Sequence, residues 1–157
     1  MQQFVRGGLA GLAATVPMTV VIAAGRAAGL MGTPPPVEIV ENVAEQAGED
    51  PDRDSPAFQA SWIAAHLGYG AACGALYALM RPLLPRSDVA AGLLFGGAVW
   101  GVSYMGVMPA LDLYPSAKDD SEPRQAVMVA AHAVFGMALA SIDSRLRANE
   151  EGGQPRR

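Results

Sequence analysis

Residues 89–111 read VAAGLLFGGAVWGVSYMGVMPAL and contain no charged side chain. Three other windows, residues 7–25, 55–80 and 125–142, are also free of charge, so all 11 basic and 15 acidic residues lie outside the four windows. About 20 mostly apolar residues cross the roughly 30 Å hydrocarbon core of a bilayer as a helix. A helix also satisfies its own backbone hydrogen bonds there. The pattern predicts an all-α membrane protein, a bundle of four transmembrane helices.

The charge-free windows set the expected bounds of the helices and of the domain. The four spans are expected at residues 4–28, 57–80, 89–111 and 124–145. A chain of 157 residues is short enough for a single domain. We expect that domain over residues 1–147, followed by a disordered cytoplasmic tail at residues 148–157.

Lysine and arginine positions predict the orientation of the bundle, because cytoplasmic loops carry an excess of these residues. Seven lie at the amino terminus, in the turn at residues 81–87 and in the carboxy-terminal segment: Arg6, Arg81, Arg86, Arg145, Arg147, Arg156 and Arg157. Four lie on the opposite side: Arg26, Arg53, Lys118 and Arg124. Both termini are therefore expected in the cytoplasm. The short turn predicts that the second and third spans are antiparallel neighbours.

The loop between the first two spans has a helical pattern of its own. Thr33 can cap a helix whose first turn takes the prolines at 34–36. Apolar residues then recur at helical spacing: Val37, Val40, Val43, Ala44 and Ala47. Acidic residues occupy another face: Glu38, Glu41, Glu45 and Glu49. We expect a short amphipathic helix across the outer mouth of the bundle, with its acidic face in solvent rather than on anionic lipid.

The second and fourth spans resemble each other. Residues 62–77 read WIAAHLGYGAACGALY, and residues 128–143 read MVAAHAVFGMALASID. At a constant offset of 66, Ala64, Ala65, His66, Gly70 and Ala72 recur as Ala130, Ala131, His132, Gly136 and Ala138. Two duplicated helical hairpins would give this pattern, with a pseudo-two-fold axis along the membrane normal. Chance similarity between Ala-rich helices is the alternative.

Small residues four positions apart predict where the helices approach most closely. The pairs are Gly70 with Gly74, Gly92 with Gly96, Gly97 with Gly101, and Gly136 with Ala140. The packing candidates among them are Gly70, Gly74, Gly92, Gly96 and Gly136. Pro17 lies inside the first span and predicts a kink. Thr15 or Thr19 is expected to bond the carbonyl that the proline leaves without a partner.

The chain's two histidines, His66 and His132, fall at equivalent depths of the second and fourth spans. Ionisable residues inside a bilayer are costly and commonly functional. The favoured hypothesis is a structural, accessory or binding component of the membrane, in which each ring bonds a neighbouring helix and no cofactor is needed. A second hypothesis is a small transporter or proton-coupled channel that uses both rings. A third is haem or divalent-metal binding between them, with Gly70 and Gly136 making room for a porphyrin.

Other classes of function have no support in the sequence. It contains no nucleophile–base set, phosphate-binding loop or HExxH motif, so we expect no enzyme. It offers no basic surface for nucleic acid. The single cysteine, Cys73, gives no disulfide framework, and Asp143 is expected to pair locally with Arg145. The expected partners are the lipid bilayer and a second copy of the chain or another membrane protein.

The runs GLAGLAATVPMT (residues 8–19), AAHLGYGAACGALYAL (64–79) and MVAAHAVFG (128–136) resemble a group of small bacterial inner-membrane proteins of unknown function, the YagU-like proteins. The resemblance covers nearly the whole chain. It implies a multi-pass protein of a bacterial inner membrane. The group supplies no established substrate, cofactor or catalytic residue.

Overall fold

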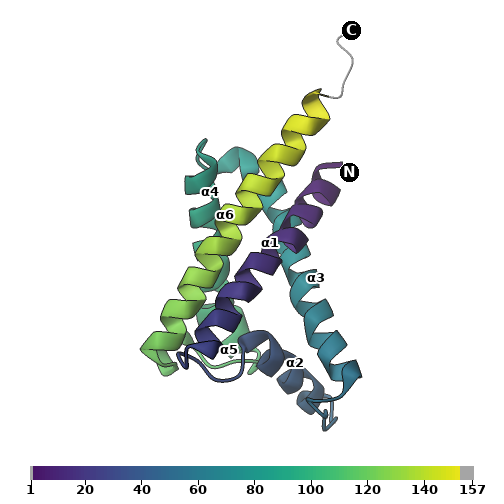
Figure 1. Cartoon of the computed structure of the whole chain (residues 1–157), viewed down its shortest axis with the longest axis vertical. Helices are drawn as coiled ribbons and strands as arrows, with labels where there is room; N and C mark the ends of the chain where they lie inside the picture. The colour runs from purple at the N-terminus through teal and green to yellow at the C-terminus, as the bar shows by residue number, and fades with distance from the viewer. Residues whose placement is uncertain (1, 153–157) are drawn as a thin grey trace.

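The computed structural model describes residues 2–152, which form helices joined by short loops (Figure 1). The first, second and fourth spans are α1 (Gln2–Ala27), α3 (Pro56–Met80) and α6 (Glu122–Gly152). The third span is α4 (Asp88–Val102), which continues through the π-helix η2 (Ser103–Val107) into α5 (Met108–Ala110). Each of the four segments is long and apolar enough to cross a membrane. The predicted all-α bundle of four long apolar helices is confirmed.

Shorter elements lie in the connections. Helix α2 (Pro35–Gln46) joins α1 to α3, which confirms the additional helix predicted in the first loop. The 3₁₀-helix η1 (Arg81–Leu83) follows α3, and η3 (Ala117–Asp119) precedes α6. Helix α2 begins after Pro34, and no side chain caps its first turn. The prediction that Thr33 caps this helix is therefore wrong.

Helix α6 is longer than the sequence predicted. It continues past residue 145 to Gly152 and includes residues 148–152 of the expected tail. No Gly or Pro interrupts this stretch before Gly152, so nothing in the local sequence breaks the helix earlier. Residues 153–157 of that expected tail lie outside the described residues.

The four long helices pack in the order α3–α1–α6–α4. The start of α1, the end of α6 and η1 lie together at one end of the bundle, here called the terminal end (Figure 1). Helices α2 and α5 lie at the other end, here called the α2 end (Figure 1). Helices α3 and α4 touch near η1, where the rings of Tyr77 and Phe95 are 5.2 Å apart. Their backbones then separate toward the α2 end, so the two helices pack closely only near their turn.

Glycines bring α1 and α3 into backbone contact. A Cβ atom on Gly11 would overlap the carbonyl oxygen of Gly70 and lie 2.8 Å from the Cα atom of Gly74. A Cβ atom on Gly7 would overlap the carbonyl oxygen of Gly74. Only hydrogen fits at these positions, which is how small residues let membrane helices approach.

A second glycine contact joins α4 to α6. A Cβ atom on Gly136 would overlap the carbonyl oxygen of Gly92, and one on Gly96 would overlap that of His132. Gly97 and Gly101 belong to the same kind of sequence step, but no heavy atom lies within 4 Å of a Cβ placed on either. These two glycines therefore face away from every described helix, contrary to expectation.

Buried residues of α6 form the centre of the bundle. Met128, His132, Phe135 and Leu139 pack against the neighbouring helices along one face. On the same face Asp143, with a side chain 1% exposed, accepts a 2.8 Å hydrogen bond from Nε of Arg6 on α1. Asp143 therefore does not pair with Arg145 as predicted, because residues two apart on a helix do not face each other.

Helix α1 continues through Pro17. The hydroxyl of Thr15 donates to the carbonyl of Gly11 at 2.9 Å, and that of Thr19 donates to the carbonyl of Thr15 at 2.8 Å. Neither hydroxyl bonds Ala13, the residue whose carbonyl Pro17 leaves without its helical partner. The expected role of the two threonines is therefore wrong, and the kink stays a prediction.

Candidate functional site

A cavity of about 240 Å³ lies at the α2 end, between α3, the η2–α5 segment and the face of α6. Its wall is mostly apolar, and both His66 and His132 contribute to it. The cavity exists because α3 and α4 separate here. Helix α2 covers the space with Pro35, Pro36, Ile39 and Val40.

The hydrogen bonds of His66 define its tautomer. Its Nε2 atom lies 3.2 Å from the hydroxyl oxygen of Thr19. That hydroxyl already donates its proton to the carbonyl of Thr15, so it accepts from His66. In the neutral ring Nε2 therefore carries the proton, and Nδ1 is an acceptor.

His132 has the complementary arrangement. Its Nδ1 atom lies 2.8 Å from the carbonyl oxygen of Met128, which can only accept, so Nδ1 donates. The Nε2 atom of the neutral ring is then an acceptor. Both histidines also line a smaller hollow of about 20 Å³ deeper in the bundle, beside Thr15 and Cys73. The site thus contains two imidazole acceptors in an apolar setting.

His66 also borders a second, more polar hollow. This vestibule of about 660 Å³ lies between α1, α2 and α3 and includes Arg26, Arg53, Asp54 and Gln59 in its wall. His66 is therefore shared between a polar and an apolar compartment. His132, only 8% exposed, borders only the apolar side among the described hollows.

On the side between α3 and α4, one hydrogen bond links two residues of the cavity wall. The hydroxyl oxygens of Tyr69 and Ser103 lie 2.6 Å apart. Tyr69 and its neighbour Ala65 both line the cavity and are exposed at the surface. Beyond this bridge the cavity opens toward the face of the bundle that a bilayer would cover.

The π-helix η2 shapes the opposite wall. Its wider turn presents both Ser103 and Tyr104 to the cavity, and the amide of Met108 donates to the carbonyl of Ser103. Short π-helical turns inside α-helices are frequent at functional sites. Sequence reasoning missed this element. The available signal was Pro109, which cannot donate the next helical hydrogen bond.

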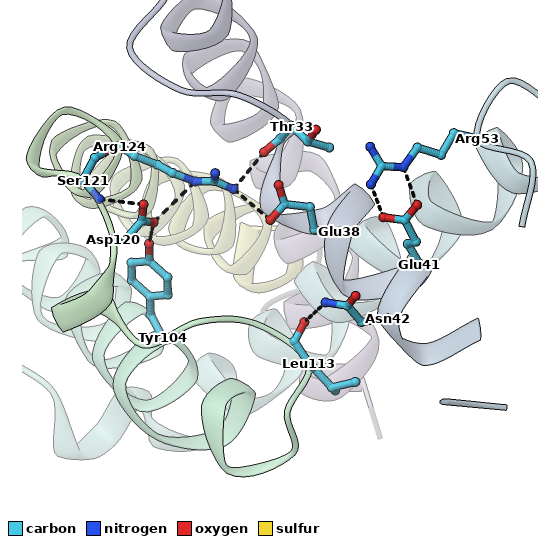
Figure 2. Close-up of polar contacts among 10 residues, drawn as sticks. All are labelled: Thr33, Glu38, Glu41, Asn42, Arg53, Tyr104, Leu113, Asp120, Ser121 and Arg124. Atoms are coloured by element: carbon cyan, nitrogen blue, oxygen red, sulfur yellow. Dashed lines mark hydrogen bonds and ion pairs between the residues drawn. The ribbon is translucent and has the colours of Figure 1, made fainter. Parts of the chain in front are cut away.

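Arg124, at the start of α6, fastens α2 over the cavity (Figure 2). Its Nη2 atom donates to the carbonyl of Thr33 at 2.8 Å and to Oε2 of Glu38 at 3.1 Å. Its Nε atom is 3.4 Å from a carboxylate oxygen of Asp120, and that carboxylate accepts from the hydroxyl of Tyr104. We call the Arg124–Glu38–Asp120 cluster the latch.

The underside of the latch is aromatic. The guanidinium of Arg124 lies 5.2 Å from the ring centre of Tyr114, a cation–π distance. Burial raises the pKa of the Tyr114 hydroxyl above its ordinary value. Tyr114 therefore stays protonated while it packs against the latch.

Further contacts hold the rest of α2 (Figure 2). Asn42 donates to the carbonyl of Leu113 at 2.8 Å. Glu41 accepts both guanidinium hydrogen bonds of Arg53, and this partner raises the pKa of Arg53. The acidic face of α2 is therefore not simply solvated, because Glu38 and Glu41 bind arginines from other segments.

Metal and haem binding gain no support from this geometry. Within residues 2–152, no group of three or more His, Cys, Asp or Glu side chains is placed to hold a metal ion. His66 and His132 alone would supply two of the four ligands of a structural zinc site. A porphyrin is larger than the 240 Å³ cavity that the two rings share.

Comparison with known proteins places the chain in a family. A family model matches residues 1–152, and it is described as a family of unknown function, DUF6789. The chain belongs to this family. No curated protein and no solved structure matches it. The resemblance to YagU-like proteins, the bacterial origin and the internal duplication stay predictions.

Proposed function

We propose that the protein is a binding component of the membrane rather than an enzyme, and that its cavity holds a small apolar molecule with a hydrogen-bond donor. The supporting observation is that His66 and His132 line one apolar cavity, each with an acceptor nitrogen left over from its bonds within the protein. Apolar pockets with a few converging polar groups are typical ligand sites. A hydroxyl or N–H group on the ligand would match the two acceptors.

The size and position of the cavity restrict the ligand further. A volume of about 240 Å³ is below the range of roughly 300–1,000 Å³ for drug-sized ligands. A molecule with one or two rings fits this volume. Such a molecule concentrates in the bilayer and would enter between α3 and α4, past the Tyr69–Ser103 bridge.

Two matched probes test this proposal. Naphthol has two fused rings and one hydroxyl, and naphthalene has the same rings without it. Binding to the purified protein in detergent is followed by probe fluorescence anisotropy. We expect naphthol to bind about two- to tenfold more tightly than naphthalene, because one buried hydrogen bond contributes about 0.5–1.5 kcal/mol.

Variants assign that difference to the histidines. The double variant His66→Leu/His132→Leu should abolish the advantage of naphthol while naphthalene still binds, because the single hydroxyl can bond either ring. Leu94→Phe, on an exposed face of α4, is the control and should change neither affinity. Equal affinities of the two probes for the unmodified protein would refute the role of the histidines, and the absence of saturable binding would refute the site.

Proton-coupled passage is a second candidate, favoured by the position of His66 between the polar vestibule and the apolar cavity. Tyr77, Phe95 and Leu139 form a packed layer toward the terminal end, so passage would require that layer to open. Proton flux into proteoliposomes, measured with an internal pH-sensitive dye, tests this candidate. Flux that His66→Phe abolishes would favour it over simple binding.

We further infer that both termini face the cytoplasm of a bacterial cell, with the α2 end outside the inner membrane. The arginine distribution supports this orientation, and a second copy of the chain is the protein partner we expect. In a Cys73→Ala background, Ser121→Cys should react with an impermeant maleimide in intact cells. Ser87→Cys should be protected. The reverse pattern would invert the orientation.

A further inference from the structure

At the terminal end, far from the histidine cavity, four arginines surround a separate hollow. Its volume is about 550 Å³, and the arginines come from α1, η1, the following turn and α6. They are Arg6, Arg81, Arg86 and Arg147. We call this hollow the arginine hollow.

The carboxylates near the arginine hollow do not neutralise it. Arg6 pairs with Asp143 at 2.8 Å and with Glu150 at 2.7 Å. Arg81 pairs with Asp88 at 2.9 Å. Among the side chains that the structure describes, neither Arg86 nor Arg147 has an ion-pair partner. Among the described side chains, three carboxylates therefore face four guanidinium groups, which leaves one positive charge for an anionic ligand.

Arg81 also has a donor without a partner. Its two Nη atoms hold the turn by donating to the carbonyls of Pro85 at 2.9 Å and Arg86 at 3.0 Å. Its Nε atom is buried and has no hydrogen-bond partner within the described residues. An unsatisfied buried donor is costly, and a phosphate oxygen would satisfy it once a movement of the Arg81 side chain exposes it to the hollow.

An apolar groove adjoins the arginine hollow. It is formed by α1 and α6 and shares Arg6 and Glu150 with the hollow. Its other walls include Val5, Leu9 and Leu146, of which the first two are well exposed. A ligand with an anionic head and an apolar tail matches this combination.

We propose that the arginine hollow binds the phosphate of an anionic phospholipid, with an acyl chain against Val5, Leu9 and Leu146. The hollow lies where the membrane-spanning parts of α1, α3 and α6 end, which is the depth of lipid phosphates. Arginine pairs with phosphate through strong, directional hydrogen bonds. Basic pockets between membrane helices on the cytoplasmic side bind such headgroups. This inference is independent of the proposed ligand cavity.

Glu150 occupies part of this site. Its side chain is 46% exposed and pairs with Arg6. An exposed ion pair contributes only about 0.2–1 kcal/mol, so a phosphate replaces this carboxylate easily. Removing the charge of Glu150 should therefore strengthen lipid binding, whereas removing an arginine should weaken it.

The test measures the melting temperature of the full chain in detergent micelles. Short-chain phosphatidylglycerol is titrated in one arm, phosphatidylcholine of the same chain length in a second, and inorganic phosphate in a third. We expect a saturable rise in melting temperature with phosphatidylglycerol and no such rise in the other two titrations. An equal rise with phosphatidylcholine would overturn the proposal. A saturable rise with inorganic phosphate at similar concentrations would mean that the ligand of this site is a free anion and not a lipid.

Three variants locate the site. Arg147→Gln should weaken phosphatidylglycerol binding about tenfold or more, since a hydrogen bond to a charged group contributes ~1.5–3 kcal/mol. Glu150→Gln should strengthen it about two- to fivefold. Arg145→Gln removes an exposed arginine of α6 outside the hollow and should have little effect.

The melting temperature of each variant without phosphatidylglycerol shows whether a loss of binding is simply a loss of folding. Melting in phosphatidylcholine shows whether each variant folds, and Arg86→Gln replaces Arg147→Gln if the latter does not. Equal losses in Arg145→Gln and Arg147→Gln would indicate attraction by overall charge and would overturn the site.

Discussion

Toward the terminal end, the backbones of α1 and α3 meet with only hydrogen atoms between Gly7 and Gly74. At the α2 end, α3 and α4 stand far enough apart to leave a cavity of about 240 Å³. The bundle therefore has a closely packed half and a hollow half. Membrane helices gain little from burying apolar surface away from lipid, so close packing must hold them together. Once the glycine contacts fix the helices at one end, the other end can hold a cavity.

The largest effect is expected where backbone meets backbone. In Gly11→Leu, the new side chain would overlap the Gly70 carbonyl, which cannot move without shifting α3. We expect a loss of ~3 kcal/mol or more, observed as aggregation or loss of monodisperse protein on size-exclusion chromatography in detergent. Gly97→Leu is the matched control, because its Cβ meets no heavy atom within 4 Å. Similar behaviour of the two variants would show that the contact does not hold the bundle.

The buried ion pair at the terminal end should give the next largest effect. Arg6→Met leaves the carboxylate of Asp143, 1% exposed, without its partner. Removing one member of a buried pair costs about 3–5 kcal/mol, and the melting temperature should fall accordingly. The double variant Arg6→Met/Asp143→Leu should recover most of the loss because no buried charge remains. Failure to recover would mean that the arginine stem contributes by packing.

The latch tests the hollow half. Arg124→Gln removes the contacts with Glu38 and the cation–π contact with Tyr114, and should cost ~1–2 kcal/mol. We expect faster amide hydrogen exchange in α2 with little change in α1 and α3. Lys118→Gln removes a nearby exposed positive charge and is the control. Uniformly faster exchange throughout the bundle would mean that the two halves do not open separately.

The smallest effect concerns alkaline pH. Burial raises the pKa of Tyr114, so above about pH 10 the unfolded chain releases this proton while the folded protein keeps it. Stability should then fall as pH rises, by about 0.8 kcal/mol at roughly pH 10.5 from this group alone. Melting curves of Tyr114→Phe should show a shallower decline than those of the unmodified protein. Parallel declines would show that Tyr114 titrates normally.

The helices could be predicted well because a membrane span and an amphipathic helix each require a pattern of residue types along a continuous stretch of sequence. Charge-free windows gave the spans, and the repeating apolar residues after Thr33 gave α2. The glycine steps at Gly70 and Gly136 likewise coincide with close helix contacts. The same kind of step at Gly97 faces no helix, since the spacing identifies a small face without identifying what covers it.

Contacts between residues far apart in the sequence could not be predicted in this way. Glu38 and Arg124 are 86 positions apart, and Arg6 and Asp143 are 137 apart. Each looks in the sequence like an ordinary charge near the end of a helix. The two histidines could be placed at one depth, but their shared cavity depends on the separation of α3 and α4. Their free acceptor atoms depend on Thr19 and the Met128 carbonyl.

The order α3–α1–α6–α4 also has a consequence for biosynthesis. The ribosome delivers α1 and then α3, so the first glycine contact can form as soon as both have entered the membrane. Helix α4 emerges next, but its glycine face fits α6, the last span to be made. Until then Gly92 and Gly96 have no helix to meet. Helix α4 can therefore pack in its final position only after α6 has entered the membrane. The ligand cavity is completed only at that step.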